Sequence, residues 1–342
     1  MAKKIVLILI SLVLLCGTGL FIYGHNNLKP LATEEDGKDR PFTVLNGEST
    51  YAVLERLEDE QFLPNAFILK LYVRLFQPGV IKVGKYSLNP SLPPLEILSI
   101  LMEGRQELIK VTIPEGLTGR QIAELLEEEG ILKASDFISL LDSPALAKQL
   151  GLPETGLEGY LYPDTYYFQK DFPAEKVITH LTGTFFTTME EVYPYYRELS
   201  RVKMKEKIIL ASIIEKEYRV PDEAPLIASV FYNRLDIGMP LQSCATVIYV
   251  ITEELDKPHP DRIFERDLKL ESPFNTYYNM ALPPAPISNP GRTALEASFN
   301  PAQSDYLFFV VKDPARGTHH FTNNLTDHNS ARRSYIDGFR SK

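Results

Sequence analysis

The chain has 342 residues, enough for two or three folded domains, with 44% hydrophobic and 24% charged residues as in ordinary globular proteins. Its net charge of −9 and the lack of a long basic run argue against a nucleic-acid-binding protein, because contacts from lysine and arginine to phosphates supply most of that affinity. The only two cysteines are Cys16, inside an apolar run, and Cys244, so no disulfide framework is expected.

The N-terminal residues predict a membrane anchor. Residues 5–23 carry no charge, and as a helix they would span about 28 Å, close to the thickness of a bilayer's hydrocarbon core. Lysines precede this run and none follows directly, which predicts that residues 1–4 are cytoplasmic and that the rest of the chain faces outward. A cleaved signal peptide and a lipoprotein signal ending at Cys16 are the alternatives. The first lacks a small-residue exit, and Leu15 is unusual before a lipidated cysteine.

Residues 24–108 predict a tether and a small first domain. The polar segment 24–39 is typical of a tether. After it, residues 42–45 alternate as a strand, leucines between 54 and 71 recur at helical spacing, and residues 82–88 return as a strand. A helix at 95–102 ends at Gly104. This pattern predicts a β-α-α-β unit followed by a helix.

A larger mixed α/β domain is expected over residues 109–342. A strand and turn at 111–116 begin it, and helical patterns follow at 119–129, 134–141 and 174–197, with an aromatic loop at 157–166 between them. The predicted class is therefore α+β: an N-terminal transmembrane helix, a small subdomain and a larger domain.

One helix in this domain carries the most informative acid. Residues 205–218 follow a helical pattern that ends before Pro221, because the residue preceding a proline is disfavoured in helical conformation. Glu217 shares its face with apolar residues, and it is therefore predicted to point inward. The apolar residues of this face are Leu210, Ile213 and Ile214.

Glu215 lies on a different face, four residues before Arg219, and is predicted to point toward solvent or an arginine.

The position predicted for Glu217 suits an acid catalyst. A carboxyl on an apolar face near the negative end of a helix dipole is biased toward its protonated form. A glycosidase acid needs this bias. Considered alone, however, a glutamate at a helix end is usually an ordinary solvated or paired side chain.

A polar loop follows the next helix. The helix at 224–235 ends in Asn233-Arg234-Leu235, with Gly238 as its stop. The loop at 241–243 then leads into an apolar helix. Amide, hydroxyl and aromatic side chains of the kind found here are the types that contact sugars.

Several blocks of this sequence resemble the YceG-like endolytic murein transglycosylases, the MltG family. The blocks are residues 157–160, 163–165, 211–217, 228–235, 238–242, 246–249, 275–277, 282–284, 290–291, 317–321 and 328–329. The resemblance extends from the anchor to the C-terminus, and its blocks follow the family order.

The resemblance implies a single-pass inner-membrane protein, with a LysM-like subdomain at 40–108 and a periplasmic catalytic domain at 109–342. It implies cleavage of the β-1,4 bond between N-acetylmuramic acid and N-acetylglucosamine in nascent glycan strands, which leaves 1,6-anhydro ends and terminates elongation. The family's catalytic glutamate is the second of its Glu-x-Glu pair, here Glu217. Expected partners are glycan strands, the membrane and peptidoglycan synthases, with no cofactor and no metal.

Residues in the matching blocks are expected to contact the substrate. They are Asn233, Gln242, Thr246, Asn275, Tyr277, His319 and Asn329. The chain departs from the family at Cys244, where members often carry an acid. We expect this cysteine to be a small buried hydrophobe rather than a reactive thiol or a sugar contact.

Two other functions stay open at this point. A hydrolase would need a second carboxylate, for which Asp222, Glu223 and Asp164 are the candidates. A non-enzymatic glycan-binding protein would use the LysM-like region as its binder. A lytic transglycosylase needs only one carboxyl, since the 6-hydroxyl of the sugar replaces water.

Overall fold

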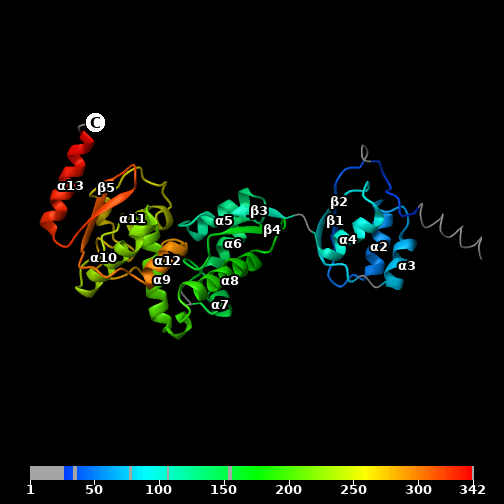
Figure 1. Cartoon of the computed structure of the whole chain (residues 1–342), viewed down its shortest axis with the longest axis horizontal. Coiled ribbons are helices and arrows are strands. Elements are labelled where there is room, and N and C mark those ends of the chain that lie inside the picture. Colours follow the sequence, from blue (N-terminus) through cyan, green and yellow to red (C-terminus); the bar gives the residue numbers. More distant parts are fainter. Residues whose placement is uncertain (1–26, 34–36, 77–78, 106–107, 153–155, 341–342) are drawn as a thin grey trace, which may run out of the picture. The chain divides into compact units, whose positions relative to one another are not determined.

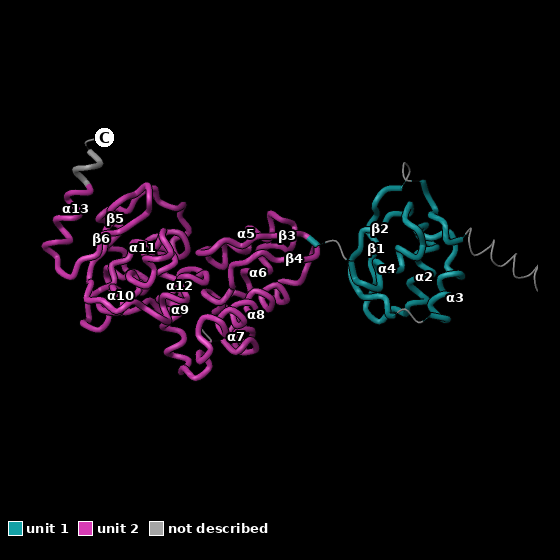
Figure 2. The backbone as a smooth tube through the Cα atoms, in the orientation of Figure 1, with its two compact units in different colours: residues 1–108 teal, residues 109–342 magenta. Residues whose placement is uncertain are grey.

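The computed structural model describes residues 27–33, 37–76, 79–105, 108–152 and 156–340. It divides into two compact units, residues 1–108 and 109–342 (Figure 2). The α+β class is confirmed, since many helices accompany three two-stranded antiparallel sheets in the described ranges (Figure 1). The predicted cytoplasmic tail at 1–4 and transmembrane helix at 5–23 lie outside the described residues. Of the helices that are described, none has the length and apolar character to cross a membrane.

Unit 1 is built on one antiparallel strand pair with helices packed against it. Phe42 and Val44 alternate with exposed residues on the first strand, and Tyr86 and Leu88 do so on the second, so one face of the pair is buried. The element order is β1 (Arg40–Val44), α2 (Thr50–Asp59), α3 (Ala66–Phe76), β2 (Gly84–Leu88) and α4 (Pro94–Glu103).

Short-range signals set the helix ends of unit 1. The Ser49 hydroxyl accepts a hydrogen bond from the Ala52 N–H at 3.2 Å and caps the start of α2. Gly104, with φ of 73°, ends α4 in the left-handed conformation that glycine adopts without strain.

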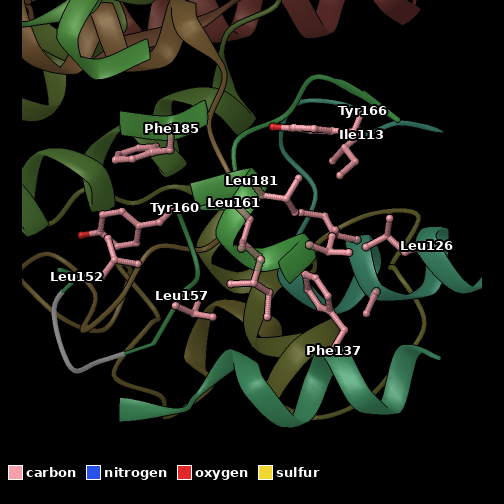
Figure 3. Packing of buried hydrophobic residues seen from close by; sticks show 14 of the residues in the cluster. Ile113, Leu126, Phe137, Leu152, Leu157, Tyr160, Leu161, Tyr166, Leu181 and Phe185 are labelled. Atoms are coloured by element: carbon pink, nitrogen blue, oxygen red, sulfur yellow. The ribbon is translucent and has the colours of Figure 1, made fainter. Parts of the chain in front are cut away.

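The first part of unit 2 packs four helices and a strand pair around one core (Figure 3). The predicted aromatic loop at 157–166 is confirmed over residues 157–164, which form turns and irregular backbone, while Thr165 and Tyr166 belong to a strand. Leu157, Tyr160 and Leu161 of this loop are buried in the core. The elements are β3 (Ile109–Thr112), α5 (Gly119–Glu128), α6 (Ala134–Leu141), α7 (Pro144–Gln149), β4 (Thr165–Phe168) and α8 (Ala174–Val192).

Helix α8 ends five residues earlier than predicted. Tyr193 has φ of −149° and ψ of 86° because it precedes Pro194, which excludes the helical conformation. A single 3-10 turn, η1 (Tyr196–Glu198), follows.

The second part of unit 2 has its own apolar cluster, formed mainly by α9, α10 and α12. An antiparallel hairpin follows α12, and α13 contacts both of its strands. The elements are α9 (Arg201–Glu217), η2 (Pro221–Glu223), α10 (Ala224–Asp236), α11 (Cys244–Tyr249), η3 (Val250–Glu254), η4 (Asp267–Lys269), α12 (Arg292–Phe299), β5 (Phe308–Asp313), β6 (Thr318–Thr322) and α13 (Leu325–Arg340).

Candidate active site

Glu217 is the last residue of α9, and its side chain is half-buried. The helix stops here because Tyr218 turns to an extended conformation, with ψ of 151°, before Val220 and Pro221. Ile213 and Ile214, one turn earlier, are fully buried in the second cluster of unit 2. The helix therefore fixes the Glu217 carboxyl against the interior of the unit.

Among the residues that the structure describes, one side chain forms a hydrogen bond with the Glu217 carboxyl. The hydroxyl of Ser243, the residue before α11, donates a hydrogen bond of 2.5 Å to Glu217 Oε1. Burial raises the pKa of Glu217, while the Ser243 hydroxyl and then electrostatic interactions with His319 and Arg234 lower it. A raised pKa keeps a proton available for transfer, and the three lowering groups stabilise the carboxylate that the transfer leaves.

The buried Arg234 on α10 holds the loop that carries Ser243. Its guanidinium donates to the Leu241 carbonyl at 2.7 Å and to the Leu307 carbonyl, just before β5, at 2.6 Å. The neighbouring Asn233 donates to two more carbonyls of the same incoming segment, at residues 304 and 306, both at 2.9 Å. The end of α10 thus positions both the Ser243 loop and the hairpin.

A buried hydroxyl pair fixes the same loop from the other side. The side chains of Thr246 and Thr276 lie 2.9 Å apart, and Thr276 Oγ1 accepts the Ser243 N–H at 3.1 Å. Gln242 has φ of 52°, a left-handed conformation that is uncommon for a residue with a side chain. Backbone strain at this position accompanies the placement of Ser243 against Glu217.

The hairpin brings His319 to the end of α9. Its Nδ1 lies 2.7 Å from Glu223 Oε2, and its backbone N–H donates to both oxygens of the same carboxyl at 3.1 Å. At the hairpin turn, a Cβ on Gly317 would lie 2.7 Å from the Arg219 Cβ, so only glycine allows this close approach. Gly317 also has φ of 69°.

Glu215 does not face solvent or an arginine, so that prediction is wrong. Its Oε2 accepts the Gly291 N–H, at the start of α12, at 2.9 Å, and the Tyr218 hydroxyl lies 3.4 Å from its Oε1. Burial raises the pKa of Glu215 to about 7. The face of α9 that carries Glu215 is covered because α12 packs along α9, a contact that the spacing of residues within α9 cannot indicate.

Asn289 gives the block at 157–160 and the neighbouring block at 290–291 a structural role. Its Oδ1 accepts the N–H groups of Gly159 and Leu161, both at 2.9 Å, and its amide nitrogen donates to Glu158 at 2.7 Å. Burial raises the pKa of Glu158 to about 8. These bonds join the 157–161 segment to the segment entering α12.

The structure places the predicted substrate contacts in different settings. Asn233, Thr246 and Asn275 make hydrogen bonds within the protein, and the last donates to the carbonyls of residues 268 and 270 at 3.1 and 2.8 Å. Gln242 is exposed and Tyr277 is half-buried. His319 is bonded to Glu223 as described, and Asn329 lies on α13.

Cys244 is exposed rather than buried, which corrects the sequence-based expectation. Its sulfur lies 3.2 Å from the Tyr277 hydroxyl. It is exposed because it is the first residue of α11, directly after the buried Ser243. In the ranges that the structure covers, no group of His, Cys, Asp and Glu side chains is suited to hold a metal ion.

Ser243 and Arg234 were not identified from the sequence as site residues, and Glu223 was named only as a possible second carboxylate of a hydrolase, not as the partner of His319. A serine before an apolar helix is a common sequence feature, and a partner 26 or more positions away leaves no local signal. An arginine within an otherwise apolar helix pattern was the one available sign, because a buried guanidinium must find acceptors.

A helix-terminal glutamate with a raised pKa, a hydroxyl partner and nearby cationic side chains defines a general acid–base enzyme. The chain belongs to the YceG-like family, whose model matches residues 42–334.

The chain is similar to several known proteins. It is 31% identical over 341 residues to the endolytic murein transglycosylase of Bacillus subtilis (strain 168), covering 95% of this chain and 92% of that protein. It is 29% identical over 356 residues to that of Streptococcus pneumoniae serotype 2, covering 94% of this chain but only 63% of the longer relative. The crystal structure of a YceG-like protein from Listeria monocytogenes matches with a TM-score of 0.57 and 33% identity, covering 86% of this chain and 99% of that one.

Proposed function

We propose that this chain is an endolytic murein transglycosylase that cuts peptidoglycan glycan strands. The curated relatives from Bacillus and Streptococcus carry that name. The observation that carries the proposal is the half-buried Glu217, whose pKa burial raises and whose carboxyl accepts the Ser243 hydroxyl at 2.5 Å. The bond cut is the β-1,4 link between N-acetylmuramic acid and N-acetylglucosamine.

Glu217 serves as both acid and base in this reaction. Protonated Glu217 gives its proton to the glycosidic oxygen, and the bond from that oxygen to the anomeric carbon breaks. The carboxylate then takes the proton of the same sugar's 6-hydroxyl, whose oxygen bonds to the anomeric carbon and closes a 1,6-anhydro ring. One proton leaves Glu217 and one returns, and no water is consumed.

Hydrolysis is the alternative, and the contacts of the candidate second carboxylates argue against it. Both Glu223 oxygens accept the His319 backbone N–H, and one of them also bonds the imidazole. Asp222 and Asp164 are exposed, unlike a carboxyl prepared for catalysis by burial. None of these three carboxyls is thus prepared as a second catalytic group beside Glu217, which favours transglycosylation.

The proposal includes the location and organisation of the protein. Residues 5–23 would anchor it in the cell membrane, with the folded units on the outer side, where glycan strands are made. Unit 1 would act as a LysM-like domain and residues 109–342 as the catalytic domain. Peptidoglycan synthases would be its partners, and cleavage of nascent strands would terminate their elongation.

The test is mass spectrometry of purified glycan strands digested by the protein. Transglycosylation gives products with 1,6-anhydro-N-acetylmuramic acid ends, and hydrolysis gives reducing ends, which are heavier by one water. The Glu217→Gln variant should bind glycan and give neither product. Reducing ends from the native protein would overturn the proposal in favour of a hydrolase.

A further inference from the structure

Helix α3 of unit 1 (Ala66–Phe76) carries more apolar surface than the core of the unit uses. Only Ala66 and Leu69 are fully buried. Phe67, Leu75 and Phe76 are exposed over 57%, 66% and 68% of their surface. A helix that is apolar nearly all round is normally buried on all sides, so this one lacks a partner for its outer face.

The exposed and half-buried apolar residues form one continuous arc along the helix. At about 100° per residue, Phe67, Leu71 and Leu75 follow one another at steps of four along one line of the surface. Ile68 and Phe76 lie on the adjacent line, between that arc and the core. We call these five residues the α3 patch. Figure 1 shows α3 at the edge of unit 1.

Cationic side chains border the α3 patch along the line of the helix that begins at the buried Ala66. Lys70 pairs with Glu55 on α2 at 2.5 Å. Arg74 is exposed and has no ion pair within the described ranges. Aromatic residues with adjacent lysine or arginine are typical of helices that lie in the membrane interface.

The length of α3 limits how it can meet a bilayer. Eleven residues of helix extend about 16 Å, roughly half the thickness of the hydrocarbon core. The helix can therefore lie along the surface but cannot cross. Its outer face then reaches the boundary between headgroups and acyl chains, while its inner face keeps its contacts with unit 1.

Chemistry and position favour a lipid surface over a sugar or a protein as the occupant. The side chains of the α3 patch carry no polar group, and the one hydroxyl on α3 is that of Tyr72, whose ring centroid lies 5.0 Å from that of Phe76. A glycan site requires several hydrogen-bonding groups beside its aromatic rings. The uncharged run at 5–23 is joined to β1 by about sixteen residues, and part of this segment lies against unit 1, since the Leu31 and Ala32 N–H groups both donate to the Pro90 carbonyl at 3.1 Å. A bilayer that holds this run lies within reach of unit 1.

We propose that the α3 patch docks unit 1 onto the outer surface of an anionic membrane. Phe67, Leu71, Leu75 and Phe76 enter the interface, and Arg74 faces lipid phosphates. This docking relies on the proposed anchor for proximity, but it does not depend on the catalytic role of Glu217. It gives the first unit a second attachment to the membrane.

Fluorescence of single-tryptophan variants tests this docking directly, because the chain contains no tryptophan. The full chain carrying Phe76→Trp is reconstituted into vesicles of phosphatidylethanolamine and phosphatidylglycerol. Tyr51→Trp, on α2 of the same unit and 44% exposed, is the matched control. We expect the indole at position 76 to shift its emission to the blue and to be quenched by brominated lipids. The control should stay accessible to acrylamide.

Two further variants separate the contributions. Adding Phe67→Asp and Leu75→Asp to the Phe76→Trp chain should abolish quenching by brominated lipids. Replacing phosphatidylglycerol with phosphatidylcholine should weaken the quenching, because it removes the negative charge facing Arg74.

Two results would overturn the proposal. In the first, the indole at position 76 remains accessible to acrylamide and unquenched in vesicles, which means that the patch does not meet lipid. In the second, it becomes shielded in detergent without lipid as the protein concentration rises, which means that a second copy covers the patch. Because the assay contains no glycan, neither result bears on cleavage.

Discussion

The hydroxyl of Ser243 donates a 2.5 Å hydrogen bond to the carboxyl of Glu217, from the loop before one helix to the last residue of another. Within the described residues, Oε2 of Glu217 has no side-chain hydrogen-bond partner. One oxygen is thus held in place while the other is available for proton transfer. Four predictions follow from this arrangement and the contacts around it.

Replacing Ser243 with alanine should change the pH dependence of cleavage. The Ser243 hydroxyl lowers the pKa of Glu217, so its removal should raise that pKa and move the alkaline limb of the pH–rate profile to higher pH. We expect kcat to fall roughly tenfold at neutral pH, since the carboxylate formed after proton transfer loses a partner. Ser139→Ala, at an exposed position on α6, is the control. An unchanged profile for Ser243→Ala would mean that this bond has no role in the reaction.

The two glutamates of α9 should differ sharply in their effect on activity. Glu217→Gln removes the only proton donor of the proposed mechanism, so cleavage should fall by at least about a thousandfold. Glu215→Gln keeps an oxygen for the Gly291 N–H and an amide group for the Tyr218 hydroxyl, and we expect it to stay within about tenfold of the native rate. Rates on purified glycan with folded variants check this prediction. Comparable losses in both would contradict the assignment to Glu217.

Stability should fall as pH rises from about 5 to 7. The pKa of Glu215 is about 7 in the folded chain against an ordinary value of 4.5, so the folded state holds a proton that the unfolded state has lost. Folding is therefore favoured at the lower end of this window, by up to about 3 kcal/mol, since one pKa unit is about 1.4 kcal/mol. Glu158, with a pKa of about 8, should extend the fall in stability to higher pH.

Urea unfolding across this pH range measures the effect. Glu215→Gln cannot ionise, and its stability should decline less steeply between pH 5 and 7 than that of the native protein. Parallel curves for the two proteins would show that Glu215 is not the group responsible.

Alanine at Gly317 should cost more than alanine at Gly238. Both glycines have left-handed backbones, with φ of 69° and 67°, so each substitution carries about 1 kcal/mol of backbone strain. Only at Gly317 would the new Cβ press on a neighbour, the Arg219 Cβ at 2.7 Å, whereas nothing lies within 4 Å at Gly238. Thermal unfolding should show the larger loss for Gly317→Ala, and cleavage should weaken with it because the hairpin carries His319. Equal losses of stability in the two variants would mean that the turn accommodates the new Cβ without a shift of the hairpin.

Local sequence patterns were sufficient for several helix bounds in unit 2. The bounds of α6 were predicted correctly, and those of α10 to within one residue, because apolar spacing and a following turn determine them. The end of α9 was also foreseen within one residue, since Pro221 acts through its immediate neighbours.

Contacts between distant residues could not be predicted in this way. His319 and Glu223 are 96 positions apart, and the local sequence around either residue gives no sign of the other. The wrong direction given to Glu215 has the same origin, because the helix that covers it begins at residue 292. The strand β4 was missed because its aromatic residues are typical of both strands and loops.

Helix α9 is fixed at both ends, so insertions and deletions within it are expected to be rare among related chains. Ser200 caps its start through the Lys203 N–H at 3.2 Å, and Tyr218 ends it immediately after Glu217. Inserting or deleting one residue between these points would rotate the carboxyl by about 100° and shift it about 1.5 Å along the axis. Ser243 would then face Lys216 after an insertion or Tyr218 after a deletion, instead of the acid. Length changes should therefore accumulate in the segment between η3 and η4, away from both ends of α9, and stay rare within the helix itself.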